Sequence, residues 1–437
     1  MKLLQVLALV LISNYGYSQK KLIDKLENYM NAQASINNFG GTVLISRNDT
    51  VLLKKAYSMA NYEWQVKNTI DTKFSLASVS KQFTAVGILQ LAENKKLSLN
   101  DHLIKYFPNF QKGEKITLKM LLTHNSGLQM DYDELYTEKT SLDQDSVESY
   151  LSKKTLLFEP GTKTAYSNIG YYLLARIIEK VSGQSYAEYL QEHLFNKAKM
   201  KNTGISTNDS IVEKMADTYY LKNDKLIKNP YINWNFNIGH DGVYSTVEDL
   251  YLWNKALFEG KDILSEESKK EMFTSYNEQD FGLGLVINPF YNQNHNLIAH
   301  DGGFYGAMTS FNKYTDDKLF ITVLSNNQSP SYLISYGLAA ICFGKDVEIP
   351  YKHKQIKIDT TIYKKYAGDY DNIKVLEKNN KLYYQDYEIE LLPESKIKFF
   401  RSDDNDRTIE FIENKKGEIV KLVVTKAGVK EIKMKSK

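Results

Sequence analysis

Hydrophobic and polar residues follow strand-like patterns at both ends of the first three quarters of the chain and helical patterns between them. Two apolar-rich runs, 41–46 and 50–57, flank Arg47-Asn48-Asp49, which predicts a β-hairpin. Residues 100–275 show mostly helical periodicity broken by polar loops, and strand-like runs return between residues 281 and 325. This order predicts an α+β unit, in which an antiparallel sheet is closed by sequence-distant strands beside a helical subdomain.

A change of pattern near residue 347 predicts a separate C-terminal domain. Residues 347–356 are polar and contain a proline, so we expect a linker there. Short alternating segments follow, separated by turns such as Asn379-Asn380. They predict a small all-β barrel or sandwich over residues 357–437, whose sequence contains no cluster of catalytic residue types.

The first eighteen residues have the layout of a secretory signal peptide. A single lysine precedes about ten apolar residues, and small and polar residues follow up to Gln19, before a helical pattern begins. The apolar core is short for a bilayer span, and an uncleaved anchor is the alternative. No cysteine follows the leader to carry a lipoprotein anchor, and the single cysteine, Cys342, cannot form an internal disulfide. We therefore predict a periplasmic or secreted protein with no transmembrane segment after removal of residues 1–18.

Composition and charge change this picture little. The 437 residues are 42% hydrophobic and 25% charged, with a formal net charge of +3. A chain of this length and ordinary composition is expected to form two or three structural units. The small net charge gives no reason to expect nucleic acid or an anionic membrane as a partner.

Ser78 and Lys81 are the most informative pair in the sequence. They stand at the predicted first turn of an apolar helix, where residues i and i+3 share a face. A desolvated lysine can accept the proton of a serine hydroxyl, and a helix N-terminus favours a developing oxyanion. The same Ser-x-x-Lys spacing at Ser18, Ser310 and Ser395 lacks this helical context. The alternative is that Ser78 only caps a buried helix.

Two further segments supply candidate groups for such a serine. The turn at Pro160-Gly161 delivers Tyr166 and Asn168 just before an apolar helix, and a tyrosine near a lysine can act as a general base. A turn tyrosine bonded to backbone is the alternative. His124 ends an apolar helical stretch and is assigned a structural role.

The tripeptide His-Asp-Gly occurs twice, and the two copies are separated by their context. His300-Asp301-Gly302 is flanked by strand-like runs, and its glycine-rich edge, which continues to Gly303, allows a substrate carbonyl to approach backbone N–H groups. His240-Asp241-Gly242 runs into a helix-capping sequence and is interpreted as a helix lead-in. We therefore favour His300 as the site residue.

These blocks, in this order, resemble the serine β-lactamase and penicillin-binding-protein-like superfamily, specifically its class C branch of β-lactamases, D-stereospecific peptidases and esterases. The resemblance covers roughly residues 30–345 and includes two further blocks, 121–128 and 242–250. It implies an α/β/α sandwich with an antiparallel sheet and a helical subdomain, a catalytic domain over residues 19–346, and a lipocalin-like domain after the linker. No cofactor or metal is implied.

The resemblance also implies a role for each candidate residue. Ser78 becomes the acylated nucleophile, Lys81 shares or relays its proton, and Tyr166 is the general base that later activates water. Asn168 contacts the substrate amide, and His300 takes the strand position that lysine holds in a Lys-Thr-Gly motif. The oxyanion hole is formed by backbone N–H groups of Ser78 and Gly303, with Gly302 beside them.

Two departures from the family pattern bear on the substrate. Histidine is largely neutral near pH 7, and Asp301 replaces a hydroxyl residue near the place where β-lactam carboxylates bind. Either its side chain faces inward and repels anions, or strand alternation turns it away. We therefore expect a serine hydrolase acting on esters, amides or D-amino-acid-containing peptides, for which the cell wall is one source.

Three alternatives remain open at this point. The first is a catalytically silent penicillin-binding or sensing protein of the same fold, and the second is a genuine class C β-lactamase. The third treats the C-terminal barrel as the working part, which binds a lipid or glycan.

Overall fold

The structure, a computed structural model, describes residues 2–36, 39–132, 135, 143–222, 225–229, 232–385, 388–403 and 407–436. These residues divide into two units. Gly40–Tyr332 form one unit, and Met1–Phe39 together with Leu333–Lys437 form the other. The domain boundaries expected from the sequence stay a prediction.

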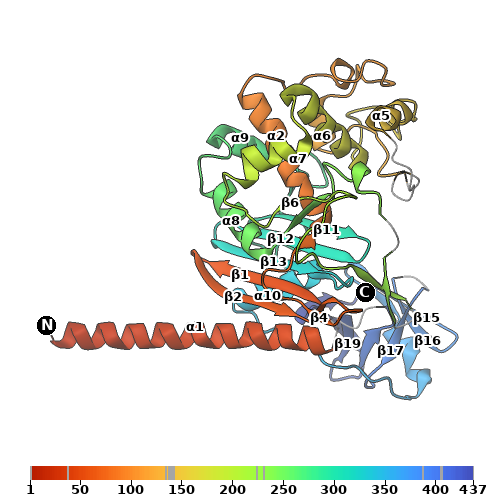
Figure 1. Cartoon of the computed structure of the whole chain (residues 1–437). Coiled ribbons are helices and arrows are strands. Elements are labelled where there is room, and N and C mark those ends of the chain that lie inside the picture. The colour runs from red at the N-terminus through yellow and green to blue at the C-terminus, as the bar shows by residue number, and fades with distance from the viewer. Residues whose placement is uncertain are drawn as a thin grey trace. The chain divides into compact units, whose positions relative to one another are not determined.

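A six-stranded antiparallel sheet is the framework of the Gly40–Tyr332 unit (Figure 1). Its strands follow the order β10-β11-β12-β13-β1-β2, so the first strands of the unit close the sheet beside its last strand. Gly41 pairs with Ser325 and Arg47 pairs with Leu319 across this closure. The predicted sheet of sequence-distant strands is therefore confirmed. The strands are β1 (Gly41–Arg47), β2 (Thr50–Tyr57), β10 (Val286–Ile287), β11 (Leu297–Phe304), β12 (Ala307–Tyr314) and β13 (Leu319–Ser325).

The predicted hairpin joins β1 and β2 through Asn48 and Asp49. Both residues have positive φ, 48° and 61°, as a two-residue turn of the type I′ class requires. Asparagine and aspartate tolerate this conformation better than other residues with a side chain, so the sequence encodes the turn locally.

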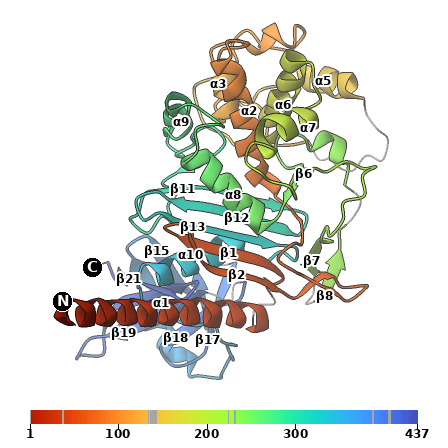
Figure 2. The same cartoon turned by 60° about the vertical axis from the view of Figure 1, so that its left-hand side comes forward.

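Helices of the same unit gather beside this sheet and form one hydrophobic core (Figure 2). Helix α8 packs directly on β1 and β13, while α2 packs against α6, α7 and α9. In α2 the residues from Lys81 to Leu91 are all buried, so this helix is the centre of the helical part. The helices are α2 (Lys81–Glu93), α3 (Leu118–Leu122), α5 (Gln144–Ser152), α6 (Asn168–Ser182), α7 (Tyr186–Leu190), α8 (Val247–Phe258) and α9 (Glu266–Met272).

Short strands and turns connect these helices where the sequence predicted polar loops. The strand β9 (Val243–Ser245) lies between β5 (Phe74–Ser75) and β6 (Gly204–Ile205), and β7 (Tyr219–Lys222) forms a hairpin with β8 (Lys225–Lys228). Two- to four-residue strands carry too little alternation to be distinguished from loops in a sequence. The remaining short elements are β3 (Met59–Asn61), β4 (Val66–Lys67), η1 (Ala77–Ser80), η2 (Leu103–Lys105), η3 (Gln191–Phe195) and η4 (Trp234–Phe236).

The second unit contains α1 (Lys2–Ile36), most of α10 (Ser331–Cys342) and an eight-stranded antiparallel sheet. The sheet is a simple meander whose ends meet, because Tyr370, the last residue of β14, bridges Lys435, which follows β21. The backbone N–H of Asp371 also donates to the carbonyl of Met434 at 3.0 Å. Its strands are β14 (Gly368–Tyr370), β15 (Ile373–Lys378), β16 (Lys381–Tyr384), β17 (Ile389–Pro393), β18 (Lys398–Arg401), β19 (Arg407–Glu413), β20 (Ile419–Lys426) and β21 (Val429–Met434), preceded by η5 (Thr360–Ile362) and α11 (Tyr363–Tyr366).

Aromatic side chains fill the interior of this barrel-like sheet. Tyr366 stacks on Phe411 with ring centroids 4.4 Å apart, and Phe399 meets Phe411 edge to face at 5.6 Å. All three residues are at most 1% exposed. The described part of the barrel is thus a packed core, which argues against the alternative that its interior binds a lipid. With the closed sheet and the helical subdomain, the predicted fold class is confirmed.

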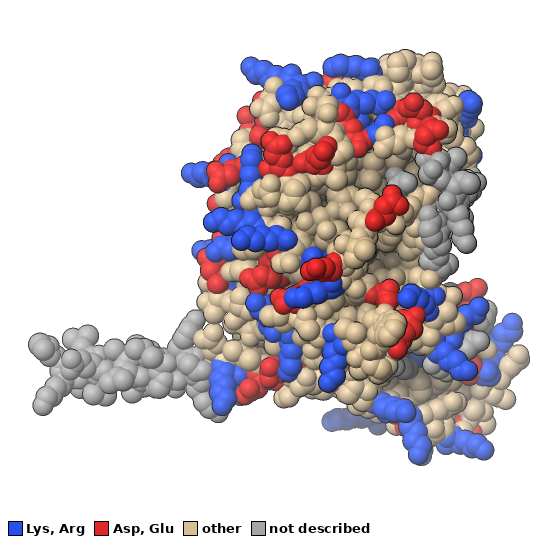
Figure 3. Space-filling view, in the orientation of Figure 1, with Lys and Arg blue, Asp and Glu red and all other residues tan. Residues whose placement is uncertain are grey.

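Charged side chains of both signs are interspersed on the face drawn in Figure 3, in keeping with the net charge of +3. None of the described helices combines the length and apolar character that crossing a membrane requires. The signal peptide expected over residues 1–18 stays a prediction.

Candidate active site

The short helical turn η1 presents Ser78 between β5 and α2. The sequence predicted Ser78 on the first turn of the helix itself, but Ala77–Ser80 form a 3₁₀ turn and α2 begins at Lys81. Ala77 has a φ of 47°, a conformation that costs free energy for a residue with a side chain. The turn packs against β11 and β12, and the hydroxyl of Thr309 donates to the carbonyl of Leu76 at 2.7 Å. Neighbouring strands therefore hold the backbone around Ser78 in place.

Lys81 lies directly against Ser78, as the sequence predicts. Its Nζ donates to Ser78 Oγ at 2.9 Å and to the carbonyl of His240 at 3.2 Å. The Lys81 side chain is 0% exposed, and burial lowers its pKa to about 8 despite nearby carboxylates, which raise it. A lysine with this pKa exchanges its proton near neutral pH, as a base for serine must.

Tyr166 also reaches the nucleophile. Its hydroxyl is hydrogen-bonded to Ser78, and Lys81 Nζ lies 4.8 Å from the centroid of its ring. Burial raises the pKa of the Tyr166 hydroxyl well above its ordinary value, although the hydrogen bond with Ser78 lowers it. Tyr166 is therefore a neutral phenol in the resting site.

Asn168 begins α6 and contacts a carboxylate that the sequence did not single out. Its Nδ2 donates to both oxygens of Asp131, at 3.0 and 2.9 Å. The side chain is buried, and among the described residues its Oδ1 has no hydrogen-bond partner. A buried acceptor of this kind can receive a substrate N–H, which fits the contact that the family resemblance implies.

His300 lies on β11 with its ring centroid 6.5 Å from that of Tyr166. Its Nδ1 donates to the carbonyl of Asp301 at 2.7 Å, which leaves Nε2 as the acceptor of a neutral ring. Burial, and then the charge of Lys81, lower the pKa of His300 to about 4. At neutral pH this strand therefore offers an uncharged imidazole where the family pattern has a cation.

The glycines of β11 allow the strand to approach η1 closely. A Cβ atom at Gly302 would overlap the carbonyl oxygen of Leu76 and the hydroxyl of Thr309. Strand β10 pairs with only Ile298 and Ala299 of β11 in the described chain, so no strand of the sheet covers the edge that follows. Gly303, on this edge, is exposed and available for the expected oxyanion contact.

The structure answers which way Asp301 points. Tyr291 donates its hydroxyl to Asp301 Oδ2 at 2.6 Å, whereas His300, one residue earlier on the strand, faces Tyr166. Strand alternation thus turns Asp301 away from the nucleophile. Burial raises the pKa of Asp301 to about 6, and this carboxylate gives no direct reason for repulsion of an anionic substrate in the site.

His124 has the contacts of a structural residue. The backbone N–H of Ser167 donates to its Nδ1 at 3.1 Å, and its ring stacks on Tyr166 with centroids 4.4 Å apart. Burial lowers the pKa of His124 well below its ordinary value, so the ring stays neutral. It orients the turn that carries Tyr166.

The second His-Asp-Gly copy also lies at the nucleophile, which corrects the separation of the two copies made from the sequence. Ser78 Oγ donates to Asp241 Oδ1 at 3.1 Å, and His240 Nδ1 lies 2.9 Å from Asp241 Oδ2. The segment does lead into α8, whose cap is Thr246, so the local interpretation was incomplete rather than false. A capping signal reports only the next helix, and no local pattern shows which distant residue a loop will contact.

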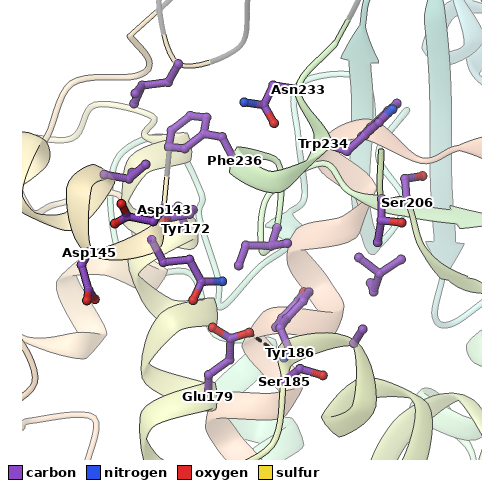
Figure 4. A pocket seen from close by; sticks show the side chains of 17 residues that line it. Asp143, Asp145, Tyr172, Glu179, Ser185, Tyr186, Ser206, Asn233, Trp234 and Phe236 are labelled. Carbon is purple, nitrogen blue, oxygen red and sulfur yellow. Dashed lines mark hydrogen bonds between the residues drawn. The ribbon is translucent and has the colours of Figure 1, made fainter. Parts of the chain in front are cut away.

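A cavity of about 640 Å³ lies among α5, α6, α7 and η4 (Figure 4). Residues from the segments 135–147 and 205–238 form much of its wall. The carbonyl of its wall residue Phe236 lies 3.1 Å from His240 Nε2. The cavity thus borders the segment that carries Asp241. Among the described residues, no group of three or more His, Cys, Asp or Glu is arranged to hold a metal ion.

The sheet, the helical part and the Ser78–Lys81–Tyr166 cluster define the class of protein. They are the framework of the serine β-lactamase and penicillin-binding-protein-like hydrolases, and the chain belongs to the beta-lactamase family, whose profile matches residues 24–336. Penicillin-binding protein 4* of Bacillus subtilis (strain 168) is 30% identical over 83% of this chain and 88% of that protein.

Solved structures share the same fold. A penicillin-binding protein from Bacillus halodurans is 25% identical and has a TM-score of 0.61, covering 74% of this chain and 98% of that one. An octameric penicillin-binding-protein homologue from Pyrococcus abyssi has a TM-score of 0.68 at 24% identity, covering 94% of this chain and 99% of that one. The second similarity extends into the C-terminal part of the chain.

Proposed function

We propose that this protein is an exported serine hydrolase that forms an acyl-enzyme on Ser78 with esters, amides or D-amino-acid-containing peptides. One observation carries the proposal: a buried lysine with a pKa of about 8 donates a 2.9 Å hydrogen bond to a half-buried serine. A serine that only caps a helix needs no buried amine, because its hydroxyl would bond the backbone of the next turn. No side-chain cap bond is formed at either η1 or α2.

The proton movements follow from the two pKa directions. With a pKa of about 8, about one Lys81 in ten is unprotonated at pH 7 and can accept the Ser78 proton as Oγ attacks the substrate carbonyl carbon. The carbonyl π electrons move to oxygen, and backbone N–H groups of Ser78 and Gly303 bind the oxyanion. The oxyanion then re-forms the carbonyl and the bond from carbon to the leaving group breaks. Tyr166, a neutral phenol, donates its proton to the leaving group and recovers one from the Lys81 ammonium.

Deacylation uses the same groups in reverse. A water molecule loses a proton to the Lys81 amine, either directly or through the Tyr166 hydroxyl. The resulting hydroxide attacks the acyl carbon. Expulsion of Ser78 Oγ, which takes a proton back, completes the turnover. In this scheme Lys81 is the first proton acceptor and Tyr166 the relay, which refines the roles expected from the family resemblance.

The charges of the site favour substrates that carry no carboxylate on the part that lies next to β11. His300 is neutral there, so it offers a hydrogen bond but no positive charge to an anionic group. Esters and amides are therefore proposed ahead of β-lactams. The alternative of a catalytically silent binding protein is less favoured. Binding alone does not require a buried lysine amine that is hydrogen-bonded to the serine.

Labelling with a fluorophosphonate tests the proposal. We expect one adduct per chain in the wild type and none in Ser78→Ala. Ser395→Ala is the matched control, because Ser395 has the same Ser-x-x-Lys spacing but accepts backbone hydrogen bonds from residues 397 and 398. Absence of an adduct in the folded wild type would refute the proposal that this protein is a serine hydrolase.

A substrate profile then distinguishes an esterase or amidase from a genuine β-lactamase. Purified protein is assayed against p-nitrophenyl esters, D-Ala and D-Phe amides, and nitrocefin, and we expect turnover of the esters or amides. Turnover of nitrocefin alone would favour a genuine β-lactamase. Export is tested separately, by N-terminal sequencing of the protein from cell fractions: a mature protein that begins near residue 19 is expected, and an intact Met1 in the cytoplasm would contradict it.

A further inference from the structure

We propose that Asp241 is a further catalytic residue, whose carboxylate is the counter-ion of Lys81 and holds the hydroxyl of Ser78 before substrate binds. This inference rests on the proposed function, because it concerns the same nucleophile. It assigns chemistry to a segment that neither the sequence patterns nor the family resemblance placed in the site.

The contacts of Asp241 engage both carboxylate oxygens. Oδ1 accepts the Ser78 hydroxyl at 3.1 Å and lies 4.0 Å from Lys81 Nζ. Oδ2 lies 2.9 Å from Nδ1 of His240, whose Nε2 in turn lies 3.1 Å from the carbonyl of Phe236. The Asp241 side chain is 3% exposed, so water does not screen its interaction with Lys81.

Four hydrogen bonds fix the segment 239–243 on η1 and α2. Two of them run from side chains of α2 to its carbonyls: Thr84 Oγ1 donates to Gly239 at 2.6 Å, and Lys81 Nζ donates to His240 at 3.2 Å. In the other two, Val243 donates to Ser80 Oγ at 3.2 Å and accepts from the backbone N–H of Leu76 at 2.8 Å.

Gly239 adds a steric reason for this placement, because its φ is 86° and a Cβ atom there would overlap the carbonyl oxygen of Tyr171. The position of Asp241 is therefore built into the fold and does not depend on a flexible loop.

Charged and titratable groups from every neighbouring element face Lys81. Asp241 comes from the segment before α8, Asp131 from the loop after α3, and His300 from β11. His124, Tyr166 and the ring of Tyr171 also lie near Lys81. The two carboxylates raise the pKa of Lys81 against the larger effect of burial, and Asp241 is the stronger of the two. Burial opposes the charge of Asp241, but His240, Lys81 and Ser78 together keep its pKa below the ordinary value.

The consequence is a resting site that must rearrange one proton before reaction. At rest the Ser78 hydroxyl points to Asp241, and Lys81 is an ammonium that donates to Ser78 Oγ. Loss of one proton from Lys81 to solvent lets the hydroxyl turn to the amine, which accepts its proton as the new C–O bond forms. Asp241 thus raises the pH above which acylation proceeds.

The test is the pH dependence of acylation in Asp241→Asn. Rates of fluorophosphonate labelling and kcat/KM for an ester are measured from pH 5 to 10. In the wild type we expect both to rise with an inflection near pH 8, the pKa of Lys81. Removing an opposite charge at this distance shifts the inflection down by about one unit or more. Activity at pH 6 relative to the plateau then rises roughly tenfold.

Two comparisons make the result decisive. Asp301→Asn removes another buried carboxylate, which is bonded to Tyr291 and faces away, and should leave the inflection near pH 8. Asp241→Glu retains the charge and should shift the inflection less than Asp241→Asn. If Asp241→Asn fails to fold, as judged by circular dichroism, Asp241→Ser is used and the same downward shift is expected. An inflection that stays near pH 8 in the neutral variants overturns the inference, whereas a wild type that is never labelled at Ser78 overturns the proposed function instead.

Discussion

Replacing Gly302 by alanine tests whether the contact between β11 and η1 positions the nucleophile. Gly302 is buried on β11, and the neighbouring atoms belong to Thr309 and to the residues just before Ser78. A Cβ atom at this position would lie 3.1 Å from the Cβ of Ala77 and would stand about 1 Å inside contact distance of the carbonyl oxygen of Leu76. Because that oxygen belongs to the backbone, no side-chain rotation can relieve the overlap.

The expected magnitude follows from this overlap. Relief requires η1 and β11 to separate by about 1 Å, which also breaks the hydrogen bond from Thr309 to Leu76. A displacement of that size in a catalytic group typically costs about 100-fold in rate. Overpacking of this kind also lowers the free energy of unfolding by about 1–3 kcal/mol. We therefore expect Gly302→Ala to fold at 25 °C with acylation slowed about 100-fold.

The assay is the second-order rate constant for fluorophosphonate labelling, measured beside urea unfolding of the same preparation. Gly170→Ala is the matched control: Gly170 is also buried, and its added Cβ would meet the nearest atom, the carbonyl oxygen of Leu121, at an ordinary 3.5 Å. This control should label at the wild-type rate and unfold no more easily. Wild-type labelling by a folded Gly302→Ala protein would refute the argument that β11 positions Ser78.

Three further predictions concern charge and the barrel. Burial raises the pKa of Asp301 to about 6, so the stability that its protonated form lends is complete at low pH and is lost as the pH rises through about 6. Asp301→Asn should therefore raise Tm more at pH 8 than at pH 5 in differential scanning fluorimetry, and an equal gain at both would contradict this. Phe411→Ala should lower the free energy of unfolding by about 3–5 kcal/mol in urea, because Phe411 is fully buried in the barrel. Ile432→Ala, on an exposed barrel position, should change it by less than about 0.5 kcal/mol. Asp131 and Asp241 both act on Lys81, so esters with an ammonium in the acyl group should show kcat/KM about tenfold above carboxylate-bearing isosteres, and the reverse order would refute this.

Local signals in the sequence predicted the elements that depend on neighbours along the chain. The Asn48-Asp49 turn and the Ser78–Lys81 pair rest on residues a few positions apart, and the strands of the sheet were predicted from periodicity. The 3₁₀ conformation of η1 was missed, because the positive φ of Ala77 is imposed by tertiary contacts and alanine does not favour it locally.

The site shows where sequence patterns stop being informative. His300 and His240 begin the same tripeptide and both border the site. The carbonyl of His240 accepts a hydrogen bond from Lys81, and the ring of His300 lies beside that of Tyr166. In the His300 copy the imidazole faces the site and Asp301 turns away, as strand alternation requires. In the His240 copy the aspartate faces Ser78 and the imidazole supports it from behind. One tripeptide thus supplies opposite groups because a strand and a turn orient successive side chains differently.

Helix α2 explains why these distant segments meet at the nucleophile. A helix buried on all sides must satisfy every polar side chain that it carries, because an unpaired buried group costs about 1–3 kcal/mol. Thr84 and Lys81 do so with carbonyls of the 239–243 segment, and Gln82 accepts from the indole of Trp253 at 2.7 Å. The polar residues that anchor this segment on α2 therefore also place Asp241 on Ser78. A carboxylate at the nucleophile is thus tied to the same hydrogen bonds that allow α2 to be buried, which is why Asp241 variants must be checked for folding before their pH profiles are read.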